Sequence, residues 1–197
     1  NTRPIVAAMA VGVARAALEE LRKILTEAGV EISYDKPSHA QSAAAAEFLR
    51  MEADWEAGYL LTVRSAWQAD NNIPNSKEAS MGKAKAARVA TDITLKAVEM
   101  AGTTGYSEET LLEKWARDSK ILDIFEGTQQ IQQLVVALLQ LLARADDLAV
   151  EPHHLRHRIG ELVERAQVMD RRHVAHEHHA LLARRGVRVR LGAGCGI

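Results

Sequence analysis

Residues 76–100 read SKEASMGKAKAARVATDITLKAVEM, and this stretch decides the fold class of the 197-residue chain. Its apolar residues recur at spacings of three or four, at Ala86, Val89, Ile93, Ala97 and Met100. Because an α-helix has about 3.6 residues per turn, this spacing gathers them on one face. Gly102 follows the last of them, and a glycine at that position commonly ends a helix. The stretch therefore predicts an amphipathic helix that packs against other helices.

Two long helices are predicted before this one. The first begins after Thr2, has Pro4 in its first turn and ends before Gly29. The second begins with Ser38 as its N-cap and ends at residues 71–74, which read NNIP. The apolar stripes expected to face the core are Ile5, Met9, Val13 and Ala16 in the first helix, and Phe48, Met51, Trp55, Tyr59, Val63 and Ala66 in the second.

Two helices are predicted after it, a short one over residues 108–119 and another that begins after Thr128. The last one has the apolar stripe Ile131, Leu134, Val135, Leu138 and Leu142. No stretch alternates between apolar and polar residues for long enough to predict a strand. Residues 1–148 are therefore expected to form an all-α domain, an antiparallel helical bundle with short connections.

The composition changes after this bundle. No lysine occurs beyond residue 148, and seven of the eight histidines lie between His153 and His179. Residues 149–197 are expected to form an atypical extension rich in arginine and histidine, with one more helix and a loose tail. The histidines of residues 173–179 lack a second group of candidate ligands, so no metal site is expected.

The bulk properties are those of a soluble protein. The net charge is −1 and 47% of the residues are hydrophobic, which gives no sign of a nucleic-acid partner. No apolar run approaches the ~20 residues of a membrane span. The single cysteine, Cys195, builds no intrachain disulfide, and the first residues lack the pattern of a signal peptide, so a cytoplasmic location is expected. The opening at Asn1, without an initiator methionine, suggests a piece of a longer protein.

Three motifs carry a resemblance to a known family. Residues 120–132, KILDIFEGTQQIQ, resemble the Ile-Tyr/Phe-Glu-Gly-Thr-x-Gln-Ile-Gln signature of acyl-CoA dehydrogenases. Residues 2–12, TRPIVAAMAVG, are similar to the start of that family's C-terminal helical domain, and residues 113–120, EKWARDSK, match a third family motif. Because the three occur in the family's order and spacing, the bundle is identified as a member of that family.

The resemblance implies an oxidoreductase that introduces a 2,3 double bond into an acyl-CoA and transfers a hydride to FAD. It makes Glu126 the base that removes the α-proton. The backbone N–H of the same residue and a flavin hydroxyl would stabilise the negative charge on the thioester oxygen. Phe125 and Gly127 are expected beside the substrate, and burial with the acyl chain would make the Glu126 carboxylate a stronger base.

The start of the first helix is also implicated in catalysis by the resemblance. Some branches of the family carry the base at the position of Thr2. Because threonine cannot serve as that carboxylate, the role is assigned to Glu126. Arg3 lies beside the active site in the family and is expected to help orient it.

The resemblance places Thr128 and Gln130 against the flavin. It also brings a glycine-rich loop, with Glu99, Gly102 and Gly105, to FAD bound mainly by a neighbouring subunit. Two departures weaken this second contact. Glu99 replaces a glutamine of the family pattern, and residues 27–32, EAGVEI, lack the Arg-x-x-Phe-Gly motif whose arginine meets the pyrophosphate. A hetero-oligomer in which only some subunits complete a flavin site is one way to reconcile these departures.

The resemblance implies a protein of fatty-acid β-oxidation. It is expected to form a dimer or tetramer, either a homo-oligomer such as a homotetramer or a hetero-oligomer. Its partners are an acyl-CoA substrate and an electron-accepting flavoprotein. The bundle alone is expected to be inactive, because family members bind FAD together with an N-terminal helical domain and a middle β-domain. Two alternatives stay open: a non-catalytic helical subunit for oligomerisation, and an acyl-CoA oxidase.

Overall fold

The computed structural model describes residues 2–147, 157 and 161, and all its regular structure there is helical. The predicted extension over residues 149–197 therefore lies outside the described residues, apart from those two isolated positions. The elements are α1 (Arg3–Glu27), the 3₁₀ turn η1 (Ser38–Ala40), α2 (Ala43–Asp70), α3 (Ser76–Ala101), the 3₁₀ turn η2 (Gly102–Tyr106), α4 (Leu112–Ile124) and α5 (Gln129–Asp147).

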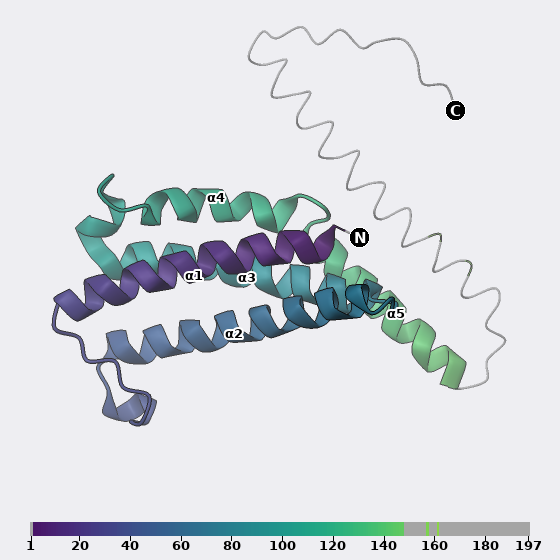
Figure 1. The fold of residues 1–197 in the computed structure, drawn as a ribbon, viewed down its shortest axis with the longest axis horizontal. Coiled ribbons are helices and arrows are strands. Elements are labelled where there is room, and N and C mark those ends of the chain that lie inside the picture. Colours follow the sequence, from purple (N-terminus) through teal and green to yellow (C-terminus); the bar gives the residue numbers. More distant parts are fainter. Residues whose placement is uncertain (1, 148–156, 158–160, 162–197) are drawn as a thin grey trace, which may run out of the picture.

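Helix α3 is the centre of the bundle and packs against α1, α2, α4 and α5. Consecutive helices from α1 to α4 alternate in direction, and α5 leaves the bundle at the end where α1 begins (Figure 1). The predicted apolar stripe of α3 is buried at Ala86, Val89, Ile93 and Ala97. The prediction of an all-α antiparallel bundle is confirmed, and the sequence-predicted bounds of α3 agree with the structure to within a residue.

The prediction of which residues of α1 face the core is wrong for the first turns of the helix. Ile5 and Met9 are exposed by 62% and 50%, whereas the neighbouring Val6, Ala7 and Ala10 are buried. Both faces of this segment are apolar, so periodicity alone could not choose between them. The small residues face inward because they let α1 lie close to α3.

The inner face of α2 also departs from the expected stripe. Phe48 and Met51 are buried as predicted, but Tyr59 and Val63 are 40% and 45% exposed. The buried positions in the second half of this helix are instead small or polar: Gly58, Thr62 and Ser65.

Two glycines explain this change of face, because they let α2 and α3 approach each other closely. A Cβ added at Gly58 would lie 3.4 Å from the Cα of Ala86. A Cβ at Gly82 would lie 3.3 Å from the carbonyl oxygen of Leu61. At this separation there is no room for the larger side chains of the predicted stripe.

Two predicted helix boundaries are corrected. Ser38 begins only the short turn η1, and the N-cap of α2 is Ser42, whose Oγ accepts a hydrogen bond from the N–H of Ala45 at 3.2 Å. Helix α4 begins and ends later in the chain than the predicted segment 108–119. It spans Leu112–Ile124 and ends next to the loop that contains Glu126. None of the described helices is long and apolar enough to span a membrane.

Candidate functional site

The loop between α4 and α5, residues 125–128, presents the predicted base at the surface. Glu126 is exposed, and its Oε2 accepts a hydrogen bond from the Oγ1 of Thr2 at 2.7 Å. The burial expected around this carboxylate is therefore not supplied by the described part of the chain. No described residue accepts a hydrogen bond from the Glu126 N–H, so that donor is available to a bound oxygen atom.

The structure joins the first residues of α1 to this loop. Thr2, the position that carries the base in some family branches, touches the Glu126 carboxylate directly. A carboxylate at position 2 or at position 126 would therefore lie at the same place in the site. Arg3 is half-buried, and its Nη1 donates to the Oγ of Ser80 on α3 at 2.6 Å. Burial lowers the pKa of Arg3, yet a guanidinium stays protonated at any physiological pH, so it provides a positive charge beside this end of the bundle.

The backbone of the loop is strained at the predicted base. Glu126 has φ +57°, and among the described residues only Asn72 shares a positive φ without being a glycine. A side chain in this left-handed region costs about 1–2 kcal/mol, and asparagine tolerates it better than glutamate does. Gly127 follows with φ +97°, where glycine is unstrained. The surrounding contacts must therefore hold Glu126 in this conformation.

Two buried side chains bind the carbonyl oxygens of this loop. Lys83 of α3 is completely buried, and its Nζ donates to the carbonyl oxygens of Asp123 at 3.2 Å and Gly127 at 2.5 Å. Gln132 of α5, 3% exposed, donates from Nε2 to the carbonyl oxygens of Glu126 at 3.0 Å and Gly127 at 3.4 Å. We call Lys83 and Gln132 together the carbonyl clamp. It fixes the backbone on both sides of the predicted base.

The remaining predicted residues in and after this loop differ in how far they are buried. Phe125 is half-buried and packs against the hydrophobic core, and Gly127 is buried. Thr128 precedes α5 and its Oγ1 lies 3.4 Å from the N–H of Ile131, a long capping bond that leaves the hydroxyl proton available to a ligand. Gln130 is exposed. This hydroxyl and amide can donate hydrogen bonds to a bound ligand.

The other predicted cofactor residues lie at the opposite end of the bundle. Nineteen residues separate Lys83, beside the loop, from Gly102 at the end of α3, which is roughly 28 Å at the helical rise per residue. Gly102 has φ +60° and nothing within 4 Å of an added Cβ. One chain does not bring the two groups of residues together. That the second group serves the flavin of a neighbouring subunit stays a prediction.

At this far end, the described lysines near the predicted contacts do not form a binding site for a pyrophosphate. Glu99 pairs with the Nζ of Lys96 at 2.8 Å, and this hydrogen bond raises the pKa of the lysine. Glu31, in the loop that lacks the family arginine, pairs with Lys36 at 2.9 Å. Each cation is already matched to an acid. The residues at the Glu126 end thus fit a flavin better than those at the far end.

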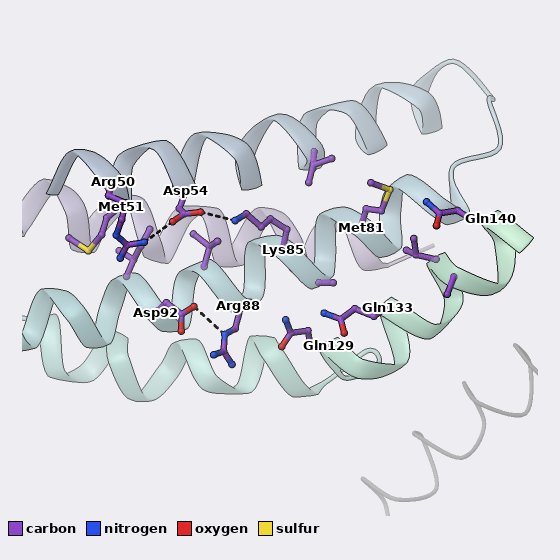
Figure 2. A pocket seen from close by; sticks show the side chains of 16 residues that line it. Arg50, Met51, Asp54, Met81, Lys85, Arg88, Asp92, Gln129, Gln133 and Gln140 are labelled. Atoms are coloured by element: carbon purple, nitrogen blue, oxygen red, sulfur yellow. Dashed lines mark hydrogen bonds and ion pairs between the residues drawn. The ribbon is translucent and has the colours of Figure 1, made fainter. Parts of the chain in front are cut away.

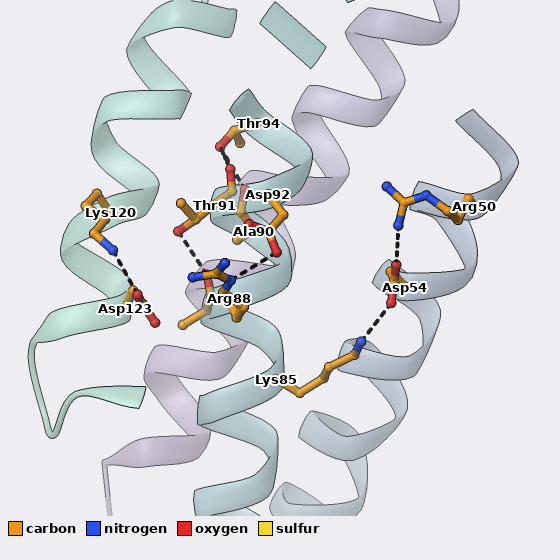
Figure 3. Close-up of polar contacts among 11 residues, drawn as sticks. Arg50, Asp54, Lys85, Arg88, Ala90, Thr91, Asp92, Thr94, Lys120 and Asp123 are labelled. Atoms are coloured by element: carbon orange, nitrogen blue, oxygen red, sulfur yellow. Dashed lines mark hydrogen bonds and ion pairs between the residues drawn. The ribbon is translucent and has the colours of Figure 1, made fainter. Parts of the chain in front are cut away.

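A cavity of about 620 Å³ lies between α2, α3 and α5, and its lining includes Gln129, which stands between the predicted residues Thr128 and Gln130 (Figure 2). Its apolar floor includes Met51, Val89 and Val136. The charged residues on its walls pair with one another: Asp54 bonds to Arg50 at 3.0 Å and Lys85 at 2.7 Å, and Arg88 bonds to Asp92 at 3.1 Å (Figure 3). The charged residues of the described chain that line the cavity are therefore all paired with a group of opposite charge, and none is left to select a ligand of one sign.

Sequence reasoning missed Lys83, Ser80 and the role of Gln132. A signal for Lys83 was present, because it lies three residues before Ala86 and so continues the buried stripe of α3. A lysine in register with a core stripe is unusual, since lysine is almost never fully buried without partners. Its partners could not be read from the sequence, because they lie 40 and 44 residues away.

Known proteins resemble this chain over most of the described bundle. The family model "Acyl-CoA dehydrogenase, C-terminal domain" matches residues 1–139. The chain is 38% identical over 132 residues to the mitochondrial short-chain specific acyl-CoA dehydrogenase of Bos taurus, covering 67% of this chain and 31% of that protein. It is 36% identical to the caffeyl-CoA reductase-Etf complex subunit CarC of Acetobacterium woodii, covering 67% and 34%. The structure of butyryl-CoA dehydrogenase from Megasphaera elsdenii superposes with a TM-score of 0.63 at 31% identity, covering 71% of this chain and 36% of that one.

Proposed function

Because the chain belongs to the acyl-CoA dehydrogenase family through its C-terminal helical domain, we propose that Glu126 is the catalytic base of a flavin-dependent acyl-CoA dehydrogenase. The chain spans about a third of the length of the curated relatives it matches. The reaction, the substrate and the partners are therefore proposed for the whole protein. FAD, when bound, accepts the β-hydrogen of the acyl group as a hydride.

The observation that carries the proposal is the geometry of the Glu126 loop. The carboxylate is exposed and held by Thr2, so it can approach the α-carbon of a thioester placed over the loop. It removes the α-proton as a general base. The N–H of the same residue has no acceptor among the described residues and can bond the thioester oxygen, where negative charge develops.

On the cofactor side we propose that Thr128 and Gln130 contact the flavin of their own site. Arg3 adds a positive charge near this end of the bundle and helps to orient the site. Glu99, Gly102 and Gly105 lie too far from Glu126 to serve the same flavin, and we assign them to the FAD of a neighbouring subunit in a dimer or tetramer. Substrate contacts of Phe125 and Gly127 would be made through the backbone, because the Phe125 side chain packs inward.

The experiment is rapid-mixing reduction of the flavin by a panel of acyl-CoAs, with the holoprotein and its Glu126→Gln variant. General-base catalysis is worth about 10²–10⁴ in rate, so the variant should bleach its flavin at least ~100-fold more slowly while binding acyl-CoA normally. Glu108→Gln, an exposed glutamate before α4, is the matched control and should reduce the flavin at the parent rate. Equal bleaching by Glu126→Gln and its parent would remove Glu126 from the role of base.

The electron acceptor is proposed to be an electron-transferring flavoprotein, because one relative is named as a subunit of a reductase-Etf complex. An acyl-CoA oxidase would instead transfer the electrons to oxygen. Anaerobic reduction followed by exposure to air separates the two: slow reoxidation supports a dehydrogenase, and rapid reoxidation supports an oxidase.

A second candidate function rests on the loop 27–32. Its acids are exposed and it carries no arginine, so this subunit would fail to complete the FAD site of its neighbour. The chain would then belong to a hetero-oligomer with fewer flavins than subunits. Flavin content per subunit distinguishes the candidates, since one FAD per subunit in a protein made only of this chain would rule out the second.

A further inference from the structure

We propose that Lys83 is a positioning residue for the predicted base: its buried ammonium holds the loop that carries Glu126 in a catalytically competent, left-handed conformation. This inference rests on the proposed function of Glu126. Lys83 itself does not touch the carboxylate. It acts through the backbone carbonyl oxygens of Asp123 and Gly127, which lie on either side of Glu126 in the sequence.

The position of Lys83 is unfavourable for stability alone. The side chain is completely buried on a face of α3 whose neighbouring buried residues are small, among them Ala79, Ser80 and Ala87. Removing an ammonium from water is costly, and an apolar side chain of similar volume is often at least as stabilising in a core. What the buried ammonium contributes is a hold on the loop, because it binds two carbonyl oxygens that α4 and α5 leave without helical partners.

Local charge supports the ammonium in this place. Asp123 belongs to the last turn of α4, where the helix dipole favours a cation. Asp123 is 7% exposed, and its carboxylate pairs with Lys120 at 3.0 Å (Figure 3). Lys83 therefore binds a carbonyl oxygen at the end of a helix where a cation is favoured.

Gln132 on α5 holds the same loop from the side opposite Lys83. Its amide binds the carbonyl oxygens of Glu126 and Gly127, so Gly127 is bound from α3 and α5 at once. A peptide plane whose oxygen is held by two donors cannot rotate without breaking both bonds. Since Glu126 is strained at φ +57°, loss of either donor would let its backbone relax and carry the carboxylate away from Thr2.

The Thr2–Glu126 contact provides a test that a merely structural role would not pass. In a Thr2→Glu/Glu126→Gly background, the carboxylate is supplied from the start of α1, and residue 126 is a glycine that needs no restraint. If Lys83 acts by placing Glu126, Lys83→Met should slow flavin reduction by about 10–100-fold in the parent holoprotein, less than the about 10²–10⁴-fold that the base itself contributes. The loss should be clearly smaller in the relocated background, because there the loop places only the N–H of residue 126 and no longer the carboxylate, and acyl-CoA affinity should stay within ~3-fold in both.

Hydrogen exchange supplies a readout that does not depend on activity. Amide exchange at residues 126–128 should rise about tenfold or more in Lys83→Met, while exchange in the centres of α1 and α2 stays unchanged. Gln132→Leu, which removes the clamp from α5, should reproduce both effects and replaces Lys83→Met if that variant fails to fold.

Each outcome decides the inference. Equal loss of rate in both backgrounds, or unchanged exchange at the loop, would overturn it. If the relocated protein is inactive, loop exchange alone decides. Activity of Glu126→Gln would refute the proposed base, whereas the exchange measurement would still show whether Lys83 holds the loop. The two failures are therefore distinguishable.

Discussion

Gly105→Ala is expected to destabilise the bundle, whatever its effect on flavin binding. Gly105 is buried in η2, directly after α3. A Cβ at this position would lie 2.5 Å from the carbonyl oxygen of Val98, 3.0 Å from its Cα and 3.1 Å from the Cβ of Ala101. Two of these atoms belong to the backbone of α3 and cannot rotate away. The turn itself must move.

The magnitude follows from the depth of this overlap. Overpacking a well-packed site typically costs about 1–3 kcal/mol, and a clash with rigid helix backbone belongs at the upper end, at about 2–3 kcal/mol. In a domain of this size, each kcal/mol lowers the melting temperature by about 2–4 °C, so a decrease of roughly 5–10 °C is expected. Gly12→Ala is the matched control: Gly12 is an exposed helical glycine with nothing within 4 Å of an added Cβ. Alanine there should stabilise the protein by about 0.5–1 kcal/mol.

The assay is thermal unfolding followed by far-ultraviolet circular dichroism, with and without FAD. The packing argument expects Gly105→Ala to melt earlier under both conditions and Gly12→Ala to melt slightly later. If Gly105→Ala melted within about 1 °C of the parent but lost its flavin, the glycine would be required for the cofactor, and the packing argument would be refuted.

Three further predictions test local features. Ser42→Ala should lower the free energy of unfolding by about 1 kcal/mol, because it removes an N-cap, whereas Ser38→Ala should change it by less than about 0.5 kcal/mol; urea unfolding measures both, and the reverse order would restore Ser38 as the cap. Glu126→Gly should be more stable than Glu126→Ala by about 1 kcal/mol, because only glycine relieves the positive φ; equal stability would argue against strain there. The hydrogen bond from Arg117 lowers the pKa of Glu113, so Arg117→Leu should raise that pKa in a carboxyl NMR titration. The stabilisation from this pair is complete above the ordinary glutamate pKa and is lost as the pH falls through the lowered pKa of Glu113; an unchanged Glu113 titration in the variant would contradict the assignment.

The fold could be predicted well where the pattern along the chain was unambiguous. Helix α3 has one apolar stripe with a glycine after it, and its bounds were predicted to within a residue. Helix α1 is apolar on two faces, and the choice between Met9 and Ala10 depended on which face meets α3. Helix α2 changes its buried face because Gly58 and its neighbours lie against α3. Periodicity describes one helix, and it does not say how closely the next one approaches.

The sequence by itself determined the family and led to the proposed base, because residues 120–132 form a continuous motif and Glu126 lies inside it. Only the tertiary structure showed how that glutamate is held. Its partner Thr2 is 124 positions away, and Lys83 reaches its loop across 44 positions. These contacts exist because the start of α1, the first turns of α3 and the α4–α5 loop meet at one end of the bundle. A local motif identifies the proposed base, whereas the packing of helices distant in sequence determines its conformation.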